Sequence, residues 1–154
     1  PRHIAFHPFK NFAYLIHEMI PVVTAYKFEG GDYTLIQEIP SWPDNFKGGK
    51  DGAELKVSPD GKYLYISNRG DQNTIGIYAI DQQSGKLTNK GFQSVFGKGP
   101  RDFQIDPTGK FLLVANQQTN NIVTFKINKE TGMLTQVQNM EIPVPVCIKF
   151  TEKQ

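Results

Sequence analysis

The sequence predicts an all-β protein, and within that class a β-propeller of about three four-stranded blades followed by one closing strand. Three observations predict this fold: one pattern of turns and β-rich runs occurs three times, its period is that of a propeller blade, and no stretch shows a convincing helical pattern. The prolines that mark the pattern, Pro8, Pro59 and Pro107, lie 51 and 48 residues apart. A β-sandwich of about a dozen strands is the alternative, but a sandwich does not require three units with the same turn at the same offset.

Each repeated unit contains four short β-rich runs separated by turn residues. A dipeptide ending in proline follows the first run and indicates a turn: His7-Pro8, Ser58-Pro59 and Asp106-Pro107. The second run starts with an aromatic residue and covers residues 12–16, 63–67 and 111–115. The third run covers residues 23–28, 75–80 and 122–127, and a glycine turn leads from it to the fourth. We expect blades at about residues 1–50, 51–98 and 99–144, with His7, Ser58 and Asp106 as structural turn residues.

The last part of the chain matches the first run of each unit and is not followed by a second run. Residues 145–151 form this segment, which aligns with residues 1–6 and 100–105. We therefore expect a closing strand that would complete a ring together with strands from an earlier part of a longer protein. An unpaired strand edge offers free N–H and C=O groups to another chain. The fragment is therefore expected to self-associate or to pair with the missing blades.

Composition excludes several kinds of partner. The net charge is +2 and the lysines are scattered without a basic run, so nucleic acid is not an expected partner. No apolar stretch is long enough to span a bilayer, so no membrane partner is expected. The single cysteine, Cys147, excludes an internal disulfide and fits a reducing compartment, which favours the cytoplasm. No metal-ligand spacing and no Gly-x-Ser-x-Gly motif occurs, so neither a metal nor a cofactor is expected.

The first runs place polar residues at one equivalent position. Apolar and polar residues alternate there, as in a strand with one buried face. The innermost strand of each blade lines the channel of a propeller, so residues about 50 positions apart are expected to converge around its axis. The residues at this equivalent position are His3, Glu54, Asp102 and Cys147.

A second set of candidates follows the second run of each unit. Residues that hold a fold repeat from blade to blade, whereas residues that carry chemistry differ, and here the repeats carry Glu18, Arg69 and Gln117. Arg2 and Arg101 join them from the first runs. Arginine binds carboxylate or phosphate through two parallel hydrogen bonds, and His or Glu can move a proton. This combination suits a small anionic substrate.

Structural explanations exist for several of these residues. His3 could instead bond to a neighbouring loop, and Glu54 and Arg101 could form an ion pair across blades. Asn68 and Asn116 are expected to cap turns rather than to bind a ligand.

Several motifs, taken in order, resemble those of a known family, the lactonase family of seven-bladed β-propellers. They are Pro1-Arg2-His3, Ala53-Glu54-Leu55, Val57-Ser58-Pro59-Asp60-Gly61, Ser67-Asn68-Arg69-Gly70, Gly99-Pro100-Arg101, Ala115-Asn116-Gln117 and Pro145-Val146-Cys147. That family includes bacterial 6-phosphogluconolactonases and the fungal 3-carboxy-cis,cis-muconate lactonizing enzyme. The resemblance covers the whole chain and implies that it is the C-terminal fragment of such an enzyme.

The resemblance implies catalytic roles for three residues, His3, Glu54 and Arg101, because they match the family's motif positions. Substrate-binding roles are expected for Arg2, Glu18, Arg69, Asp102 and Gln117. The chain departs from the family at Lys56 and Asp102, where many members carry histidine.

The expected activity is metal-independent hydrolysis of 6-phosphogluconolactone or a similar lactone, acting on a small anionic lactone or carboxylate. A 3-carboxymuconate cyclase and a non-catalytic propeller scaffold are the alternatives. The isolated fragment is expected to be inactive, because the absent blades would contribute to any complete site.

Overall fold

The computed structural model describes residues 1–151, which form an all-β structure without helices. Twelve strands occur in this range: β1 (His3–Phe6), β2 (Phe12–Ile16), β3 (Val22–Glu29), β4 (Asp32–Pro40), β5 (Lys50–Val57), β6 (Tyr63–Gly70), β7 (Thr74–Ile80), β8 (Leu87–Ser94), β9 (Pro100–Ile105), β10 (Phe111–Asn116), β11 (Asn121–Ile127) and β12 (Leu134–Glu141). The second and third β-rich runs of each repeat lie within these strands, so the sequence prediction of strands is confirmed.

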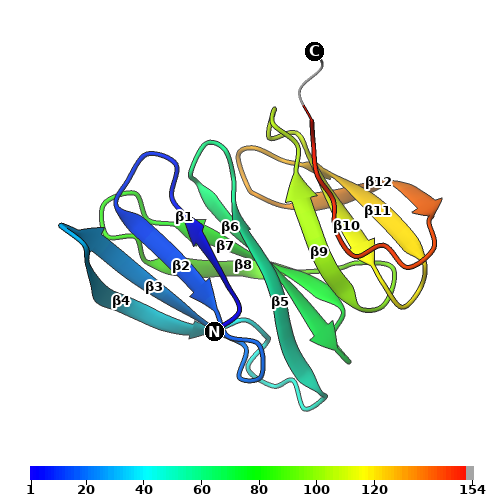
Figure 1. Cartoon of the computed structure of the whole chain (residues 1–154), viewed down its shortest axis with the longest axis horizontal. Helices are drawn as coiled ribbons and strands as arrows, with labels where there is room; N and C mark the ends of the chain where they lie inside the picture. Colours follow the sequence, from blue (N-terminus) through cyan, green and yellow to red (C-terminus); the bar gives the residue numbers. More distant parts are fainter. Residues whose placement is uncertain (152–154) are drawn as a thin grey trace.

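The strands form three separate four-stranded sheets, each an antiparallel meander (Figure 1). Sheet order follows chain order, with β1-β2-β3-β4, β5-β6-β7-β8 and β9-β10-β11-β12 as neighbours. The pairing of His3 with Ile16 across β1 and β2 sets the register of the first sheet. Three such sheets in sequence are the blades of a propeller, which confirms the predicted fold class.

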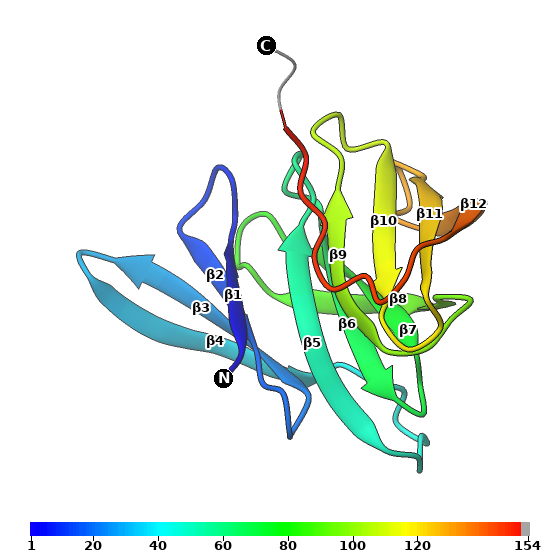
Figure 2. The ribbon, with the colours of Figure 1, turned by 45° about the vertical axis from the view of Figure 1, so that its right-hand side comes forward.

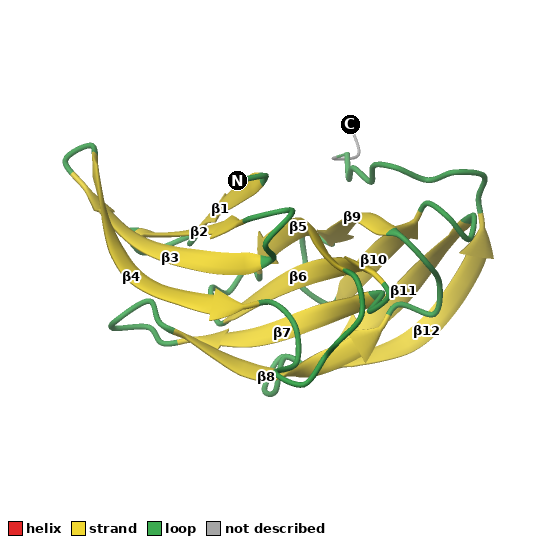
Figure 3. Cartoon of the chain, turned by 90° about the horizontal axis from the view of Figure 1, so that it is seen from below, coloured by secondary structure: helices red, strands yellow, loops and turns green. Residues whose placement is uncertain are grey.

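The three sheets fan out along an arc. Seen from below, β1, β5 and β9 lie on the inner side of the arc, and β4, β8 and β12 lie on its outer side (Figure 3). β5 contacts both β1 and β9, so the innermost strands of neighbouring blades adjoin one another. The polar positions of these three strands are thereby brought to one place.

Apolar side chains fill both spaces between the sheets. Between the first two sheets, Tyr14 and Ile16 pack with Leu55, Leu64 and other buried side chains. Between the second and third sheets, the core is built around another set: Tyr65, Ile75, Ile77, Phe103, Leu112 and Phe125. Burying one such side chain stabilises the fold by about 1.5–3 kcal/mol. The interfaces between blades are therefore the hydrophobic cores of this chain.

A repeated hydrogen bond ties each sheet to the next one. The Tyr14 hydroxyl donates to the Gly85 carbonyl oxygen at 3.1 Å, and the Tyr65 hydroxyl donates to that of Gly132 at 2.9 Å. Both glycines have positive φ, and a Cβ on Gly132 would lie 2.5 Å from the ring of Tyr63. The repeated glycine turn is thus required by a close approach between neighbouring blades.

The residues that precede proline act within their turns, as the sequence predicts. His7 Nδ1 accepts hydrogen bonds from the backbone N–H groups of residues 9 and 10, both at 3.1 Å. The Ser58 hydroxyl accepts from the Tyr63 N–H at 3.0 Å, and Asp106 accepts from the Phe111 N–H at 2.7 Å. Each of these side chains satisfies backbone donors that the turn leaves free.

Residues 145–151, which are expected to close a ring together with strands from outside this chain, carry no strand in the chain by itself. Residues 142–151 carry no strand, although the segment runs beside β9 (Figure 2). The physical reason is the absence of a ladder partner: a first strand pairs with the second strand of its own blade, and the described residues contain no second strand for this segment. One hydrogen bond fixes the segment instead, from the Ile148 N–H to Asp102 Oδ2 at 2.7 Å.

Candidate functional site

The inner ends of the three blades line an open cavity of about 610 Å³. Its lining includes all four residues that the repeat makes equivalent: His3 on β1, Glu54 on β5, Asp102 on β9, and Cys147 on the C-terminal segment. Their convergence confirms the prediction from the alternation of the first strands. Arg2 and Arg101, which precede His3 and Asp102, also line this cavity.

A buried carboxylate, Glu54, lies at the centre of one wall. Its Oε2 is 2.8 Å from His3 Nδ1, and its Oε1 is 3.3 Å from Lys56 Nζ. The His3 contact is close but lacks straight hydrogen-bond geometry, so Nδ1 is left without a hydrogen-bond partner. Glu54 Oε1 also accepts from the Leu55 N–H at 2.9 Å. Both carboxylate oxygens therefore face donors, which fixes the orientation of Glu54 beside the imidazole of His3.

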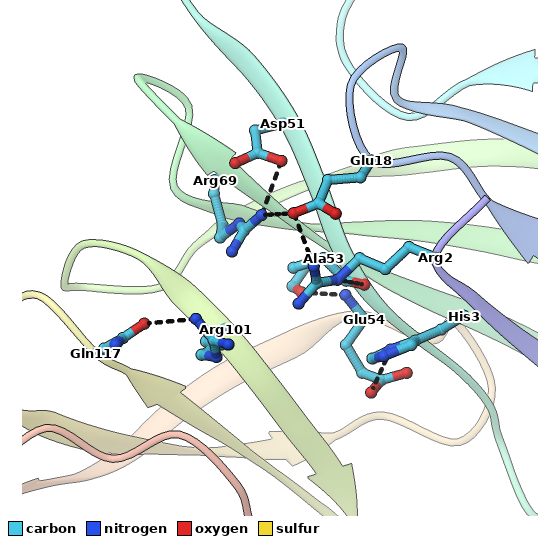
Figure 4. A network of polar contacts seen from close by, with 10 residues as sticks. Arg2, His3, Glu18, Asp51, Ala53, Glu54, Arg69, Arg101 and Gln117 are labelled. Carbon is cyan, nitrogen blue, oxygen red and sulfur yellow. Dashed lines mark hydrogen bonds and ion pairs between the residues drawn. The ribbon is translucent and has the colours of Figure 1, made fainter.

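Arg101 lies on the β9 side of the cavity and is exposed. Its Nη1 is 3.3 Å from the amide oxygen of Gln117, and no carboxylate of residues 1–151 forms an ion pair with it. Figure 4 shows Arg101 and Gln117 apart from the other charged groups. The positive charge of Arg101 is thus available to an anion. The alternative of an ion pair between Glu54 and Arg101 is wrong, because Glu54 contacts His3 and Lys56 instead.

The remaining candidates form a charge network beside the cavity (Figure 4). Glu18 Oε1 accepts from Arg2 Nη1 at 2.7 Å and from Arg69 Nη2 at 2.6 Å. Arg69 Nη2 also donates to Asp51 at 2.9 Å, and Arg2 Nε donates to the Ala53 carbonyl oxygen at 2.9 Å. The network joins the first blade to the second. Glu18, Arg69 and Gln117 do not line the cavity. Glu18 and Gln117 bond to Arg2 and Arg101, which do, whereas Arg69 is linked to the cavity only through Glu18.

The network sets the ionisation of its members. Hydrogen bonds from Arg2 and then from Arg69 hold the pKa of the Glu18 carboxyl below its usual value. Burial disfavours the charged form of Arg69, but the hydrogen bonds to Asp51 and Glu18 outweigh it and raise the pKa of Arg69. Both groups are therefore charged at neutral pH and neutralise each other.

Asn68 and Asn116 hold the connections between blades. Asn68 Nδ2 donates to the Ser41 carbonyl oxygen at 2.6 Å, and Asn116 Nδ2 donates to that of Val95 at 3.0 Å. Ser41 directly follows β4 and Val95 directly follows β8. Both asparagines therefore bind backbone carbonyl groups, as expected. These groups belong to the segment that connects the preceding blade to their own, rather than to a local turn.

Three residues of the site escaped the sequence reasoning. Lys56 and Lys149 line the cavity, each two positions after a residue of the converging set, and this spacing could have identified them. Asp51 completes the charge network, but it lies in residues 41–52, an insertion that lengthens the first interval between the repeats and has no counterpart in the other units, so the repeat gives no signal for it.

The part of the chain that the structure describes contains no group of three or more His, Cys, Asp or Glu side chains placed to hold a metal ion. No helix within residues 1–151 is long and apolar enough to cross a bilayer.

Comparison with known proteins gives one consistent result. The sequence model of a family described as "Lactonase, 7-bladed beta-propeller" matches residues 1–150. A protein of Bacillus subtilis (strain 168) named 6-phosphogluconolactonase is 39% identical over 153 residues, which cover 97% of this chain and 44% of that protein. A 6-phosphogluconolactonase of Formosa agariphila is also 39% identical, over 89% of this chain and 39% of its own length.

Solved structures agree with the sequence comparison. The periplasmic gluconolactonase of Pseudomonas aeruginosa superposes with a TM-score of 0.94 at 34% identity, over 99% of this chain and 42% of that chain. A protein from Lactobacillus plantarum superposes with a TM-score of 0.93 at 33% identity, over 99% of this chain and 45% of that one. The chain thus spans less than half the length of the relatives it matches.

Proposed function

The chain belongs to the lactonase family of seven-bladed β-propellers, and we propose that the complete protein hydrolyses a sugar lactone of the 6-phosphogluconolactone type. The observation that carries this proposal is the pairing of His3 with the buried carboxylate of Glu54 on the wall of a cavity that also presents Arg101. An imidazole, a carboxylate and an available guanidinium are the groups that ester hydrolysis needs without a metal.

His3 is assigned as the general base, with Glu54 as the group that orients it. Its Nδ1 faces Glu54 Oε2, which leaves Nε2 for a water molecule in the cavity. The water oxygen attacks the lactone carbonyl carbon while Nε2 takes the proton. The bond from that carbon to the ring oxygen then breaks, and the ring oxygen takes the proton from the imidazolium. The product is the open hydroxy acid, and Glu54 stabilises the imidazolium between the two steps.

We assign to Arg101 the stabilisation of the negative charge that develops on the carbonyl oxygen of the lactone. Its guanidinium has no carboxylate partner within residues 1–151, so it can meet this charge without first breaking an ion pair. Arg2 and Arg69 are already held by Glu18. We assign those two arginines to shaping the site, Arg2 from the cavity wall and Arg69 from beside the cavity.

Two assays of the complete protein test the proposal. Hydrolysis of 6-phosphogluconolactone releases acid, which a pH-stat follows after correction for the spontaneous reaction. Cyclisation of 3-carboxymuconate removes the absorbance of its conjugated diene. Acid release above the spontaneous rate supports the proposal. Loss of diene absorbance alone would replace the proposed hydrolysis with cyclase chemistry. No change in either assay would indicate that the protein is a non-catalytic scaffold.

The proposal also includes the compartment in which the protein acts. We place the protein in the cytoplasm, supported by its single cysteine. One structural relative is named a periplasmic gluconolactonase, so cell fractionation is the test, and recovery in the periplasm would reject this placement.

The isolated chain is proposed to associate with a second copy of itself, because it carries both faces of an interface between blades. Leu55 and Phe103 are buried against the preceding sheet, whereas their equivalent Ile4 is 46% exposed. At the other end, Phe111 is exposed where its equivalent Tyr63 is buried. The exposed face of the third sheet of one copy can therefore pack against the exposed face of the first sheet of another copy.

A further inference from the structure

Two of the cations that line the cavity have no carboxylate partner within residues 1–151, and they lie on the same side of it. Arg2 is paired with Glu18, and Lys56 is paired with Glu54. Arg101 and Lys149 form no ion pair among these residues, and the Lys149 side chain is exposed. The same side carries one carboxylate, that of Asp102, which accepts from the Ile148 N–H, so the two cations outnumber the carboxylates there.

Lys149 owes its place to a contact between β9 and the C-terminal segment. The Ile148 N–H donates to Asp102 Oδ2 at 2.7 Å, and both Asp102 and Ile148 are buried. A buried hydrogen bond to a carboxylate is among the stronger hydrogen bonds in proteins. The segment is thus fixed although it forms no strand, and Lys149 is held at the cavity wall.

Lys149 belongs to a different segment from the reacting groups. β5 lies between β1 and β9, and the C-terminal segment runs beside β9 (Figure 2). His3 and Glu54 belong to β1 and β5 and Arg101 to β9, whereas Lys149 lies on the C-terminal segment at the same cavity. A lactone whose carbonyl lies near His3 and Arg101 would extend its other end toward Lys149.

We propose that Lys149 is a specificity-determining residue that binds the phosphate group of a phosphorylated lactone, and that Asp102 positions it through Ile148. This inference rests on the proposed function. The ammonium group is a point charge that suits a phosphate with its several acceptor oxygens. Asp102 is a positioning residue in this account, because its carboxylate holds backbone rather than substrate.

The test compares a phosphorylated lactone with a neutral one. kcat/KM of the complete protein is measured for 6-phosphogluconolactone and for gluconolactone, and their ratio expresses the preference for phosphate. In Lys149→Gln this ratio is expected to fall about tenfold, since losing a charge-assisted hydrogen bond costs about 1.5 kcal/mol or more. Lys90→Gln on β8 removes the same charge from an exposed position outside the cavity and is expected to keep the ratio. A ratio in Lys149→Gln equal to that of the wild type overturns the proposal.

Two substitutions of Asp102 test its positioning role. Asp102→Ala removes the acceptor for the Ile148 N–H and is expected to lower the ratio as Lys149→Gln does. Asp102→Asn keeps an acceptor oxygen and is expected to restore the ratio. If Asp102→Asn loses as much as Asp102→Ala, Asp102 does not position Lys149 through this hydrogen bond.

Direct binding separates this inference from the proposed function. Calorimetric titration with 6-phosphogluconate and with gluconate needs no turnover. If the wild type hydrolyses neither lactone, the proposed function fails. A preference for 6-phosphogluconate that Lys149→Gln weakens about tenfold would still support the phosphate site, whereas equal affinities of wild type and variant for 6-phosphogluconate would overturn it.

Discussion

His3 and Glu54 belong to neighbouring blades and are 51 positions apart, yet their side chains meet at 2.8 Å. Their contact depends on two adjoining innermost strands whose polar faces point to the same cavity. Glu54 is buried and its oxygens face Lys56, the Leu55 N–H and His3, so it is fixed in place. His3 is more exposed and keeps its second ring nitrogen. This difference in surroundings is the reason for assigning proton transfer to His3 and orientation to Glu54.

The two roles predict different kinetic losses in the complete protein. His3→Asn removes the base and is expected to lower kcat by about 10²–10⁴-fold. Glu54→Gln keeps the shape but removes the charge that stabilises the imidazolium, so a smaller loss of kcat is expected. His17→Asn is the control, because His17 bonds to Thr24 and does not line the cavity. Steady-state kinetics that show full turnover for His3→Asn would remove it from the mechanism.

Glu18 predicts a dependence of stability on pH. Its pKa is lowered in the folded chain, first by Arg2 and then by Arg69, so its contribution is fully present above the unfolded value of 4.5 and is lost as the pH falls through the folded value. Glu18→Gln is expected to lower the free energy of unfolding near neutral pH by a few tenths to about 1 kcal/mol, because the carboxylate is partly exposed. The difference from the wild type should vanish at strongly acidic pH.

Urea denaturation at several pH values measures this effect. Glu38→Gln serves as control, because Glu38 forms no ion pair among residues 1–151. A difference between Glu18→Gln and the wild type that stays constant from neutral to acidic pH would mean that the charge of Glu18 does not stabilise the fold.

At the scale of elements, the blades are held together by apolar cores and by one hydrogen bond that recurs. Tyr14 and Tyr65 occupy equivalent positions on β2 and β6, and each donates to a glycine carbonyl of the following blade. Burial raises the pKa of both phenols above the usual value of 10, so they remain neutral donors. The third blade has Leu113 at this position, which cannot donate.

Tyr65→Phe tests the value of this link between blades. The ring stays in the core, but the Gly132 carbonyl oxygen loses its donor, so the free energy of unfolding is expected to fall by about 1–2 kcal/mol. Tyr33→Phe is the matched control, because Tyr33 is exposed and its hydroxyl makes no hydrogen bond within the described residues. Equal unfolding midpoints for Tyr65→Phe and the wild type would contradict the role of the link.

The elements also show what the sequence could predict. The repeat predicts the blades and their turns. It also predicts the convergence of His3, Glu54 and Asp102, because equivalent positions in equivalent blades share a register. Residues 145–151 carry no strand in this chain, because strand formation depends on a partner that no pattern within the segment can supply, so the closing strand stays a prediction for the complete ring. Lys149 lies two positions after Cys147, as Lys56 lies two positions after Glu54, so the repeat carries a signal for its place at the cavity. The bond from Ile148 to Asp102 that fixes this segment joins distant parts of the chain and leaves no signal in the sequence.

At the scale of the whole molecule, three blades leave two unpartnered end faces. Ile4 is 46% exposed on the first sheet, although its equivalents Leu55 and Phe103 are at most 1% exposed, and Phe6 is 49% exposed whereas its equivalent Ile105 is 9% exposed. Exposed apolar surface of this kind favours association. The chain carries the complementary face on its third blade, so head-to-tail contact between copies is expected.

Phe6→Lys tests this association in the isolated chain. A charge on the end face should make contact between copies unfavourable, so sedimentation is expected to show large species for the wild type and a shift toward monomer for the variant. Lys27→Gln is the control for a change of charge elsewhere on the first sheet, where Lys27 is exposed. A wild-type chain that stays monomeric at high concentration would contradict the expectation.

The central claim is that the cavity between the blades catalyses lactone hydrolysis with Arg101 at the developing charge. The most direct test is the turnover of 6-phosphogluconolactone by the complete protein and by Arg101→Ala, with spontaneous hydrolysis subtracted and folding checked by circular dichroism. The account predicts clear acceleration by the wild type and a loss of about 10²–10³-fold in kcat for the folded variant. Equal turnover by the two proteins would contradict the assignment of Arg101, and no acceleration by the wild type would contradict the hydrolase itself.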